Sequence, residues 1–181
     1  MLNHYPMKHY LLLITLLAFI VSPSLAQTTP HINVGEQVPV FSLQDQNGKT
    51  FNIADHIGKQ MLVIYFYPKD ESMVCTKEAC AFRDSFDDFT KAGAMVIGIN
   101  GGTAASHKAF ADHYKLPFTL LSDPGNKVYN QFGIKGKLFF SGRETMIVDK
   151  AGKICYQYES MLEGKQHAVD ALAYIKAGAK K

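Results

Sequence analysis

The chain has 181 residues, of which 47% are hydrophobic and 19% are charged. Nineteen lysines and arginines against sixteen acids give a formal net charge of +3, with no basic run and no basic–aromatic stripe. The net charge alone neither predicts nor excludes nucleic-acid binding. Because the chain has no basic run and no basic–aromatic stripe, we expect no nucleic-acid partner.

The N-terminal segment has the layout of a cleavable signal peptide. Residues 1–9 carry one lysine and no acid, residues 10–21 are almost wholly apolar, and Ser24 and Ala26 give a small-x-small cleavage pattern. The apolar run is shorter than the ~20 residues that a membrane-spanning helix needs. An uncleaved N-terminal membrane anchor is the alternative to a cleaved signal peptide. We predict a signal peptide over 1–26, cut after Ala26, and an exported protein, periplasmic or secreted, without stable membrane association.

The remaining residues, 27–181, are enough for one well-packed domain and too few for two. No internal repeat or low-complexity segment divides them. We predict one domain over 27–181, with a core over about 34–176. Three cysteines are an odd count, so at least one is left unpaired unless chains pair.

The first predicted elements are a hairpin, a buried strand and a helix. Residues 38–43 alternate apolar and polar side chains, 45–48 form a turn, and 50–53 form a second strand. Residues 61–67 are nearly all apolar, as in a central strand buried on both faces. A helix is expected over 73–91, with one buried side formed by Ala79, Phe82, Phe86 and Phe89.

Strands and helices continue to alternate after this helix. The expected strands are 94–99 and 118–121, and the expected helices are 104–114 and 126–132. A second hairpin and a last helix end the chain, at 144–148, 153–158 and 164–177. This order predicts an α/β protein with a thioredoxin-like fold: a mixed central sheet flanked by helices, with an N-terminal hairpin extension.

The junction after strand 61–67 carries the chemistry. Pro68 and a short polar loop lead into a helix that holds Cys75 and Cys80. Ser72 stands where a helix start favours a hydroxyl cap, which places Cys75 in the first turn. Backbone N–H groups there lack intrahelical partners and the helix dipole is positive, so the thiolate form is stabilised. The pattern indicates redox chemistry.

Two structural roles are the alternatives for this cysteine pair, an inert buried thiol and a permanent disulfide. Five residues along a helix separate two Cα atoms by roughly 8.6 Å, whereas a disulfide tolerates at most about 7 Å. A disulfide between Cys75 and Cys80 is therefore more plausible as a transient state than as a permanent structural bond. Cys155 is expected to be a small buried hydrophobe, and no H-x-x-x-H or C-x-x-C pattern predicts a metal site.

A family resemblance rests on these residues. The run Tyr-Phe-Tyr-Pro-Lys-Asp over 65–70 and the run Cys-Thr-Lys-Glu-Ala-Cys-Ala-Phe-Arg-Asp over 75–84 resemble the active-site segment of the peroxiredoxins, specifically the bacterioferritin-comigratory (PrxQ) subfamily. The family pattern Pro-x-x-x-Thr/Ser-x-x-Cys is met here, and residues 116–124 and 143–153 also match. The resemblance covers roughly 34–176.

This resemblance implies a thioredoxin-dependent peroxiredoxin that reduces hydrogen peroxide and organic hydroperoxides without a cofactor or metal. Cys75 corresponds to the peroxidatic cysteine and Cys80 to the resolving cysteine. An intramolecular disulfide between them is recycled by thioredoxin or a thioredoxin-like reductant, in a protein expected to be a monomer. Arg143 corresponds to the arginine beside the thiolate, Ser72 to a hydroxyl donor, and Pro68 to a shield over the thiolate. The plainer alternatives are a cap for Ser72 and a surface charge for Arg143.

One departure from the family concerns substrate range. Most relatives have Thr followed by Pro-Gly before the reactive cysteine, where this chain has Ser72, Met73 and Val74, which make the loop bulkier and more apolar. Two other functions on the same fold are the alternatives. A thiol–disulfide oxidoreductase usually carries C-x-x-C rather than the C-x-x-x-x-C found here, and a peroxide sensor would pass its disulfide to a partner.

Overall fold

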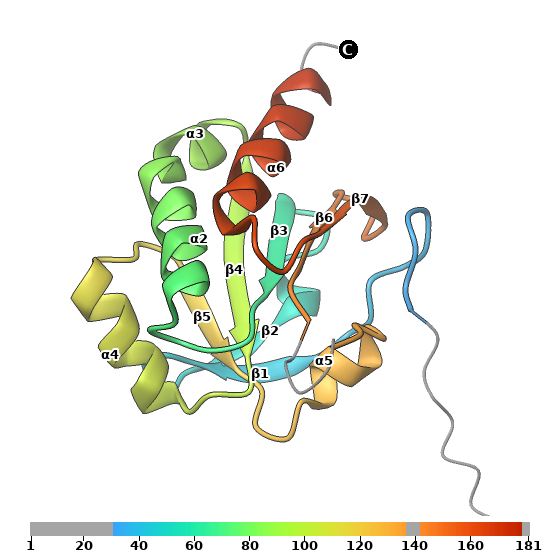
Figure 1. Cartoon of the computed structure of the whole chain (residues 1–181). Coiled ribbons are helices and arrows are strands. Elements are labelled where there is room, and N and C mark those ends of the chain that lie inside the picture. Colours follow the sequence, from blue (N-terminus) through green and yellow to red (C-terminus); the bar gives the residue numbers. More distant parts are fainter. Residues whose placement is uncertain (1–30, 137–141, 179–181) are drawn as a thin grey trace, which may run out of the picture.

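The computed structural model describes residues 31–136 and 142–178 (Figure 1). The predicted signal peptide, residues 1–26, lies outside these ranges. The strands are β1 Ser42–Asp45, β2 Thr50–Asn52, β3 Met61–Phe66, β4 Ala94–Asn100, β5 Thr119–Ser122, β6 Glu144–Val148 and β7 Ile154–Glu159. The helices are η1 Ile53–Asp55, α2 Met73–Asp84, α3 Phe86–Lys91, α4 Ala104–Tyr114, α5 Lys127–Gln131 and α6 Gly164–Gly178.

All seven strands belong to one mixed sheet in the order β2-β1-β5-β4-β3-β6-β7. β3 is an interior strand, parallel to β4 on one side and antiparallel to β6 on the other. Because both neighbours of β3 are strands and both faces are covered, an unbroken apolar run is the pattern expected of it. The α/β architecture with an N-terminal β1–β2 hairpin is as predicted.

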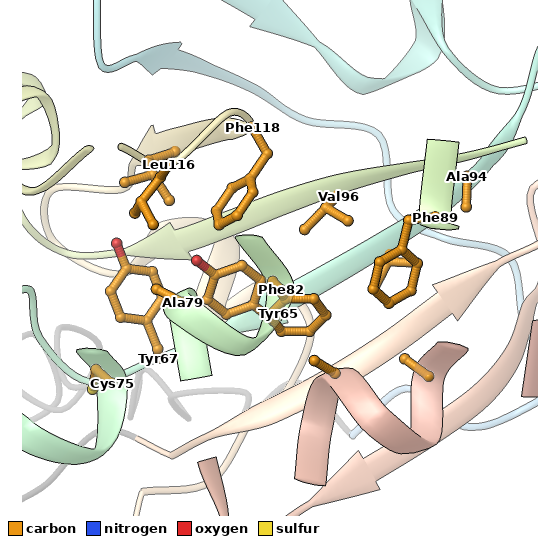
Figure 2. Close-up of a cluster of buried hydrophobic side chains, with 14 of the residues drawn as sticks. Tyr65, Tyr67, Cys75, Ala79, Phe82, Phe89, Ala94, Val96, Leu116 and Phe118 are labelled. Carbon is orange, nitrogen blue, oxygen red and sulfur yellow. The ribbon is translucent and has the colours of Figure 1, made fainter. Parts of the chain in front are cut away.

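Alternate residues of β3 point into two separate cores. Val63 and Tyr65 face a core shared with α2, α3, α4 and α6, whereas Leu62 and Ile64 face a core shared with α5 and the segment before β1. Figure 2 shows the first core as a row of aromatic rings along β3, with Cys75 at one end of the row. The core that orders the sheet therefore also holds the thiol.

Several element boundaries differ from the prediction, and three of the differences have a local cause. The helix expected over 73–91 is divided at Ser85, which leaves helical geometry with φ −106° and ψ 9°; Asp and Ser are weak formers of helix interiors. The first strand starts at Ser42 because Val38 and Phe41 pack into the core outside the β1–β2 pairing; Val38 N–H instead donates to the Gly152 carbonyl, next to an isolated bridge between Gln37 and Lys153. Ile53 leaves β2 because the Asn52 side chain accepts from Ala54 N–H and starts η1.

In the described part of the chain, no helix has both the length and the apolar character to cross a membrane.

Gly164 determines how closely α6 approaches the first turn of α2. A Cβ atom at this position would lie 2.5 Å from the Val74 carbonyl oxygen and 3.3 Å from Glu78 Cβ. The two helices touch there through backbone, so no side chain can move aside.

We predict that Gly164→Ala lowers the free energy of unfolding by about 1–3 kcal/mol, because overpacking a rigid contact forces backbone shifts. Gly178→Ala is the matched control in the same helix, since a Cβ there meets nothing within 4 Å. Urea denaturation compares the two variants. Equal midpoints would show that α6 can shift from α2 at no cost.

Candidate active site

Cys75 lies in the first turn of α2 and is 1% exposed. Ser72 occupies the N-cap position with extended backbone, as predicted, and its carbonyl accepts from Thr76 N–H at 2.8 Å. Its side chain makes no capping hydrogen bond. The hydroxyl at the mouth of the first turn is thus not used to hold the helix.

Arg143 comes from the other end of the chain to meet this turn. Phe66, the last residue of β3, pairs with Glu144, the first residue of β6, so the sheet register delivers Arg143 to the strand end that precedes Cys75. The Arg143 Nη2 group donates to Cys75 Sγ at 3.1 Å, and Nε donates to the Met161 carbonyl at 3.3 Å. The arginine is only 2% exposed, which excludes a surface role.

Glu78 is the third member of this buried group, and the sequence analysis missed it. It lies three residues after Cys75, on the same face of α2, and is fully buried. Its Oε2 accepts from Arg143 Nη1. Burial raises the pKa of Glu78 to about 8, although Arg143 opposes the shift. An acid placed among the buried residues of that helix face was the signal that could have identified it.

His167 on α6 lies beyond Glu78. Its Nδ1 is 3.5 Å from Glu78 Oε1 and 2.8 Å from Thr145 Oγ1, and its Nε2 donates to the Ser160 carbonyl at 3.0 Å. Burial, with a smaller contribution from the nearby Arg143, lowers the pKa of His167 to about 4 although the bond to the Ser160 carbonyl opposes the shift, so the ring is neutral at neutral pH.

Cys80 is not in contact with Cys75. Both cysteines are free and lie on the same unbroken helix, so their Cα atoms are separated by roughly the 8.6 Å of ideal helical geometry. Cys80 is half-buried on the side of α2 that carries Arg83. The pKa of Arg83 is raised mainly by Asp84 and in small part by Cys80.

Pro68 begins the loop before α2 and is half-buried. Asp70 anchors that loop to β4 and α4: its carboxylate accepts from Tyr67 Oη at 2.7 Å, and from three side chains at 2.5–3.0 Å, namely Asn100, Ser106 and His107. Burial disfavours the ionised form of Asp70 and by itself raises its pKa. The hydrogen bonds from His107 and Ser106 outweigh burial, so the pKa of Asp70 is lowered. The next residue, Glu71, lies in the left-handed region at φ 59°, a costly conformation for a residue with a Cβ. The sequence analysis did not identify this anchor either.

Cys155 on β7 packs against the hydrophobic core that contains Cys75. Its Sγ donates to the Ile147 carbonyl at 3.3 Å, and burial raises the pKa of its thiol. These contacts fit the expected packing role. Within residues 31–136 and 142–178, no three His, Cys, Asp or Glu side chains are grouped so that they could hold a metal ion.

Three comparisons relate this chain to known proteins. The sequence model of the AhpC/TSA family matches residues 34–157. Peroxiredoxin Q, chloroplastic, of Arabidopsis thaliana is 50% identical over 148 residues, which cover 81% of this chain and 68% of the relative. The crystal structure of peroxidoxin BcpB from Mycobacterium tuberculosis aligns with a TM-score of 0.76 and 32% identity, covering 81% of this chain and 98% of that one.

A structure of the bacterioferritin comigratory protein of Xanthomonas campestris, reported for its alkyl peroxide reduction activity, aligns with a TM-score of 0.73 and 28% identity. It covers 81% of this chain and 99% of that one. These alignments confirm the predicted thioredoxin-like fold.

The same comparisons correct the predicted location. The sequence analysis predicted an exported, periplasmic or secreted protein, whereas the curated relatives are named chloroplastic. The prediction of export is therefore wrong. An N-terminal segment with an apolar stretch is not specific enough to identify a compartment.

The raised pKa of Glu78 makes a prediction about stability. A carboxyl whose folded pKa is about 8 rather than 4.5 contributes stability that is complete below pH 4.5 and is lost as the pH rises toward 8. We predict that Glu78→Gln, which cannot ionise, gains roughly 2–5 kcal/mol of unfolding free energy relative to the unsubstituted protein over that window. Chemical denaturation at a series of pH values measures this gain. Glu163→Gln, at an exposed position, is the control, and parallel curves for all three proteins would contradict the burial argument.

Proposed function

This chain belongs to the AhpC/TSA family and is a peroxidase of the peroxiredoxin Q type, and we propose that Cys75 is its peroxidatic thiolate. In the proposed cycle, the enzyme reduces hydrogen peroxide and organic hydroperoxides, closes a disulfide between Cys75 and Cys80, and is reduced again by thioredoxin or a similar dithiol protein. Both cysteines lie on one helix, so a monomer could complete the cycle. The observation that carries the proposal is the contact between Arg143 and Cys75 Sγ inside a buried first turn.

The first step follows from the groups around Cys75 Sγ. The thiolate attacks the terminal oxygen of ROOH, an S–O bond forms as the O–O bond breaks, and the alkoxide takes up a proton to leave as ROH. The guanidinium of Arg143 stabilises the thiolate at 3.1 Å. The Cys75 N–H has no intrahelical acceptor, and the Ser72 hydroxyl is not used for capping, so both can donate to the peroxide oxygens.

The second step forms the disulfide. The Cys80 thiolate attacks Cys75 Sγ of the sulfenic acid and expels hydroxide, which is protonated to water. Because an intact helix holds the two Cα atoms about 1.6 Å beyond the ~7 Å limit for a disulfide, α2 must open locally first. The dithiol reductant then attacks the disulfide and leaves oxidised.

Burial of the reactive thiol favours a small substrate. Cys75 is 1% exposed as a residue, so a small peroxide can approach its thiol more easily than the disulfide of a folded protein can, which argues against a general thiol–disulfide oxidoreductase. Met73, 72% exposed beside the first turn, offers an apolar contact for the R group of an organic hydroperoxide. The alkyl peroxide reduction reported for the Xanthomonas campestris relative is consistent with that range.

The Cys80→Ser variant tests the cycle. We predict that it consumes one equivalent of peroxide per chain but loses steady-state turnover with thioredoxin, because the sulfenic acid has no partner thiol on α2. Stopped-flow peroxide consumption and coupled turnover measure the two phases. Cys155→Ser is the control and should keep turnover. Full turnover of the Cys80→Ser variant would eliminate the intramolecular disulfide.

Local opening of α2 makes a second prediction. Closing the disulfide gives up several helical hydrogen bonds, each worth roughly 0.5–1.5 kcal/mol net, so the oxidised protein should lose amide protection in this helix. Hydrogen exchange followed by mass spectrometry should show the reduced and oxidised forms differing mainly over α2. The neighbouring helix α4 serves as the internal reference. Identical exchange over α2 in both forms would rule out the opening step.

A further inference from the structure

The buried site holds two acids and one cation. Cys75, Glu78 and Arg143 are each at most 2% exposed, and Arg143 donates to both of the others. Arginine keeps its charge even when it is buried. If both acids were ionised, the group would carry an uncompensated negative charge, and if neither were, an uncompensated positive one; both states are unfavourable away from water. The neutral arrangement has one proton between the two acids.

One oxygen of Glu78 is buried without a hydrogen-bond donor. His167 Nε2 must be protonated, because the Ser160 carbonyl can only accept. The ring is neutral, so Nδ1 is an acceptor, and it accepts from the Thr145 hydroxyl at 2.8 Å. Glu78 Oε1 lies 3.5 Å from this nitrogen and, within the described ranges, has no hydrogen-bond partner. A buried carboxylate oxygen without a donor disfavours the ionised form of Glu78, so this geometry favours the proton on Glu78.

The other elements packed around Glu78 supply no competing charge. Tyr65 on β3 faces it, and burial together with Glu78 raises the pKa of that phenol, so it stays neutral. Thr145 on β6 is uncharged and reaches Glu78 only through His167. The charged groups that face Glu78 are thus Arg143 and, within α2 itself, Cys75.

We propose that Cys75 and Glu78 share one proton, that this proton resides on Glu78 while Cys75 is a thiolate, and that Glu78 releases it when Cys75 is oxidised. The proposal rests on the proposed function, because it uses the same peroxidatic step. Glu78 is a positioning residue in this scheme, since it acts on the thiolate through Arg143 and through the shared proton.

The released proton balances the reaction. The thiolate, ROOH and the Glu78 carboxyl become the sulfenic acid, ROH and the Glu78 carboxylate, with two electrons passing from sulfur to the peroxide. The alkoxide needs one proton, and Glu78 gives one up, directly or through water. Arg143 loses its thiolate partner at that moment and gains a carboxylate partner, so the buried group is neutral before and after the step.

Proton counting tests this directly. In a Cys80→Ser, Cys155→Ser background the reaction stops at the sulfenic acid, and one equivalent of hydrogen peroxide is added at neutral pH in weak buffer with an indicator dye. Adding Glu78→Gln keeps an oxygen acceptor toward Arg143 and an N–H donor toward His167, but removes the shared proton. We expect the Gln protein to take up one more proton from solvent per thiol oxidised than the Glu protein. Equal uptake would overturn the proposal.

Peroxide loss is followed in the same experiment. Failure of either protein to consume peroxide would count against the proposed function, whereas equal proton uptake during normal consumption counts against the shared proton alone. The two failures are therefore distinguishable.

Discussion

The guanidinium of Arg143, buried under the first turn of α2 and shared between a thiol and a carboxyl, is the interaction on which the site depends. A buried cation must be paired, and here one fork-shaped group reaches both partners and a backbone carbonyl. The helix start and the aromatic core exclude water from the thiol, while the arginine keeps its ionised form possible. Removing the charge would leave two acids without compensation in the same cavity.

The rest of the fold can be understood as the scaffold for that contact. The pairing of β3 with β6 places Arg143 beside the end of β3. The hydrogen bonds of Asp70 to Asn100 and His107 hold the loop from which α2 starts. Gly164 lets α6 come close enough to bring His167 against Glu78. The same helix that holds the thiolate must open for the proposed disulfide. The first turn of α2 therefore has to be ordered in the reduced protein, to stabilise the thiolate, and has to unwind in the oxidised protein.

The sequence predicted most of the fold because its patterns are local. An unbroken apolar run identified β3, and apolar alternation with turn residues identified both hairpins. The same signals placed α4 and β6 at their observed bounds. They failed at Ser85, where helical periodicity continues through a break in the backbone, and before β1, where apolar side chains enter the core without strand pairing. Both outcomes depend on contacts between distant segments.

The site residues also fall into those with a local sequence signal and those that are brought together only by packing. Ser72, Cys75 and Cys80 are close in sequence and were identified from a helix start and its spacing. The role assigned to Arg143 came from a family resemblance, because no local signal joins residues 68 positions apart. Glu78 was missed although its place on the buried face of α2 was an available signal, and His167 was missed because a histidine on a helix gives no such signal until packing buries it. Asp70 was missed for a related reason, as its partners lie on β4 and α4.

The most direct measurement of the central claim is the single-turnover rate of sulfenic acid formation in Arg143→Lys, compared with Arg83→Lys. These are the only arginines in the chain, and both substitutions keep the positive charge. Lysine at 143 cannot reach Cys75 and Glu78 together, so we expect the rate with hydrogen peroxide to fall on the order of a hundredfold, the usual cost of a lost donor at a reacting centre. Arg83→Lys should react at nearly the unsubstituted rate. Equal rates in the two variants would contradict the claim that the buried guanidinium activates Cys75.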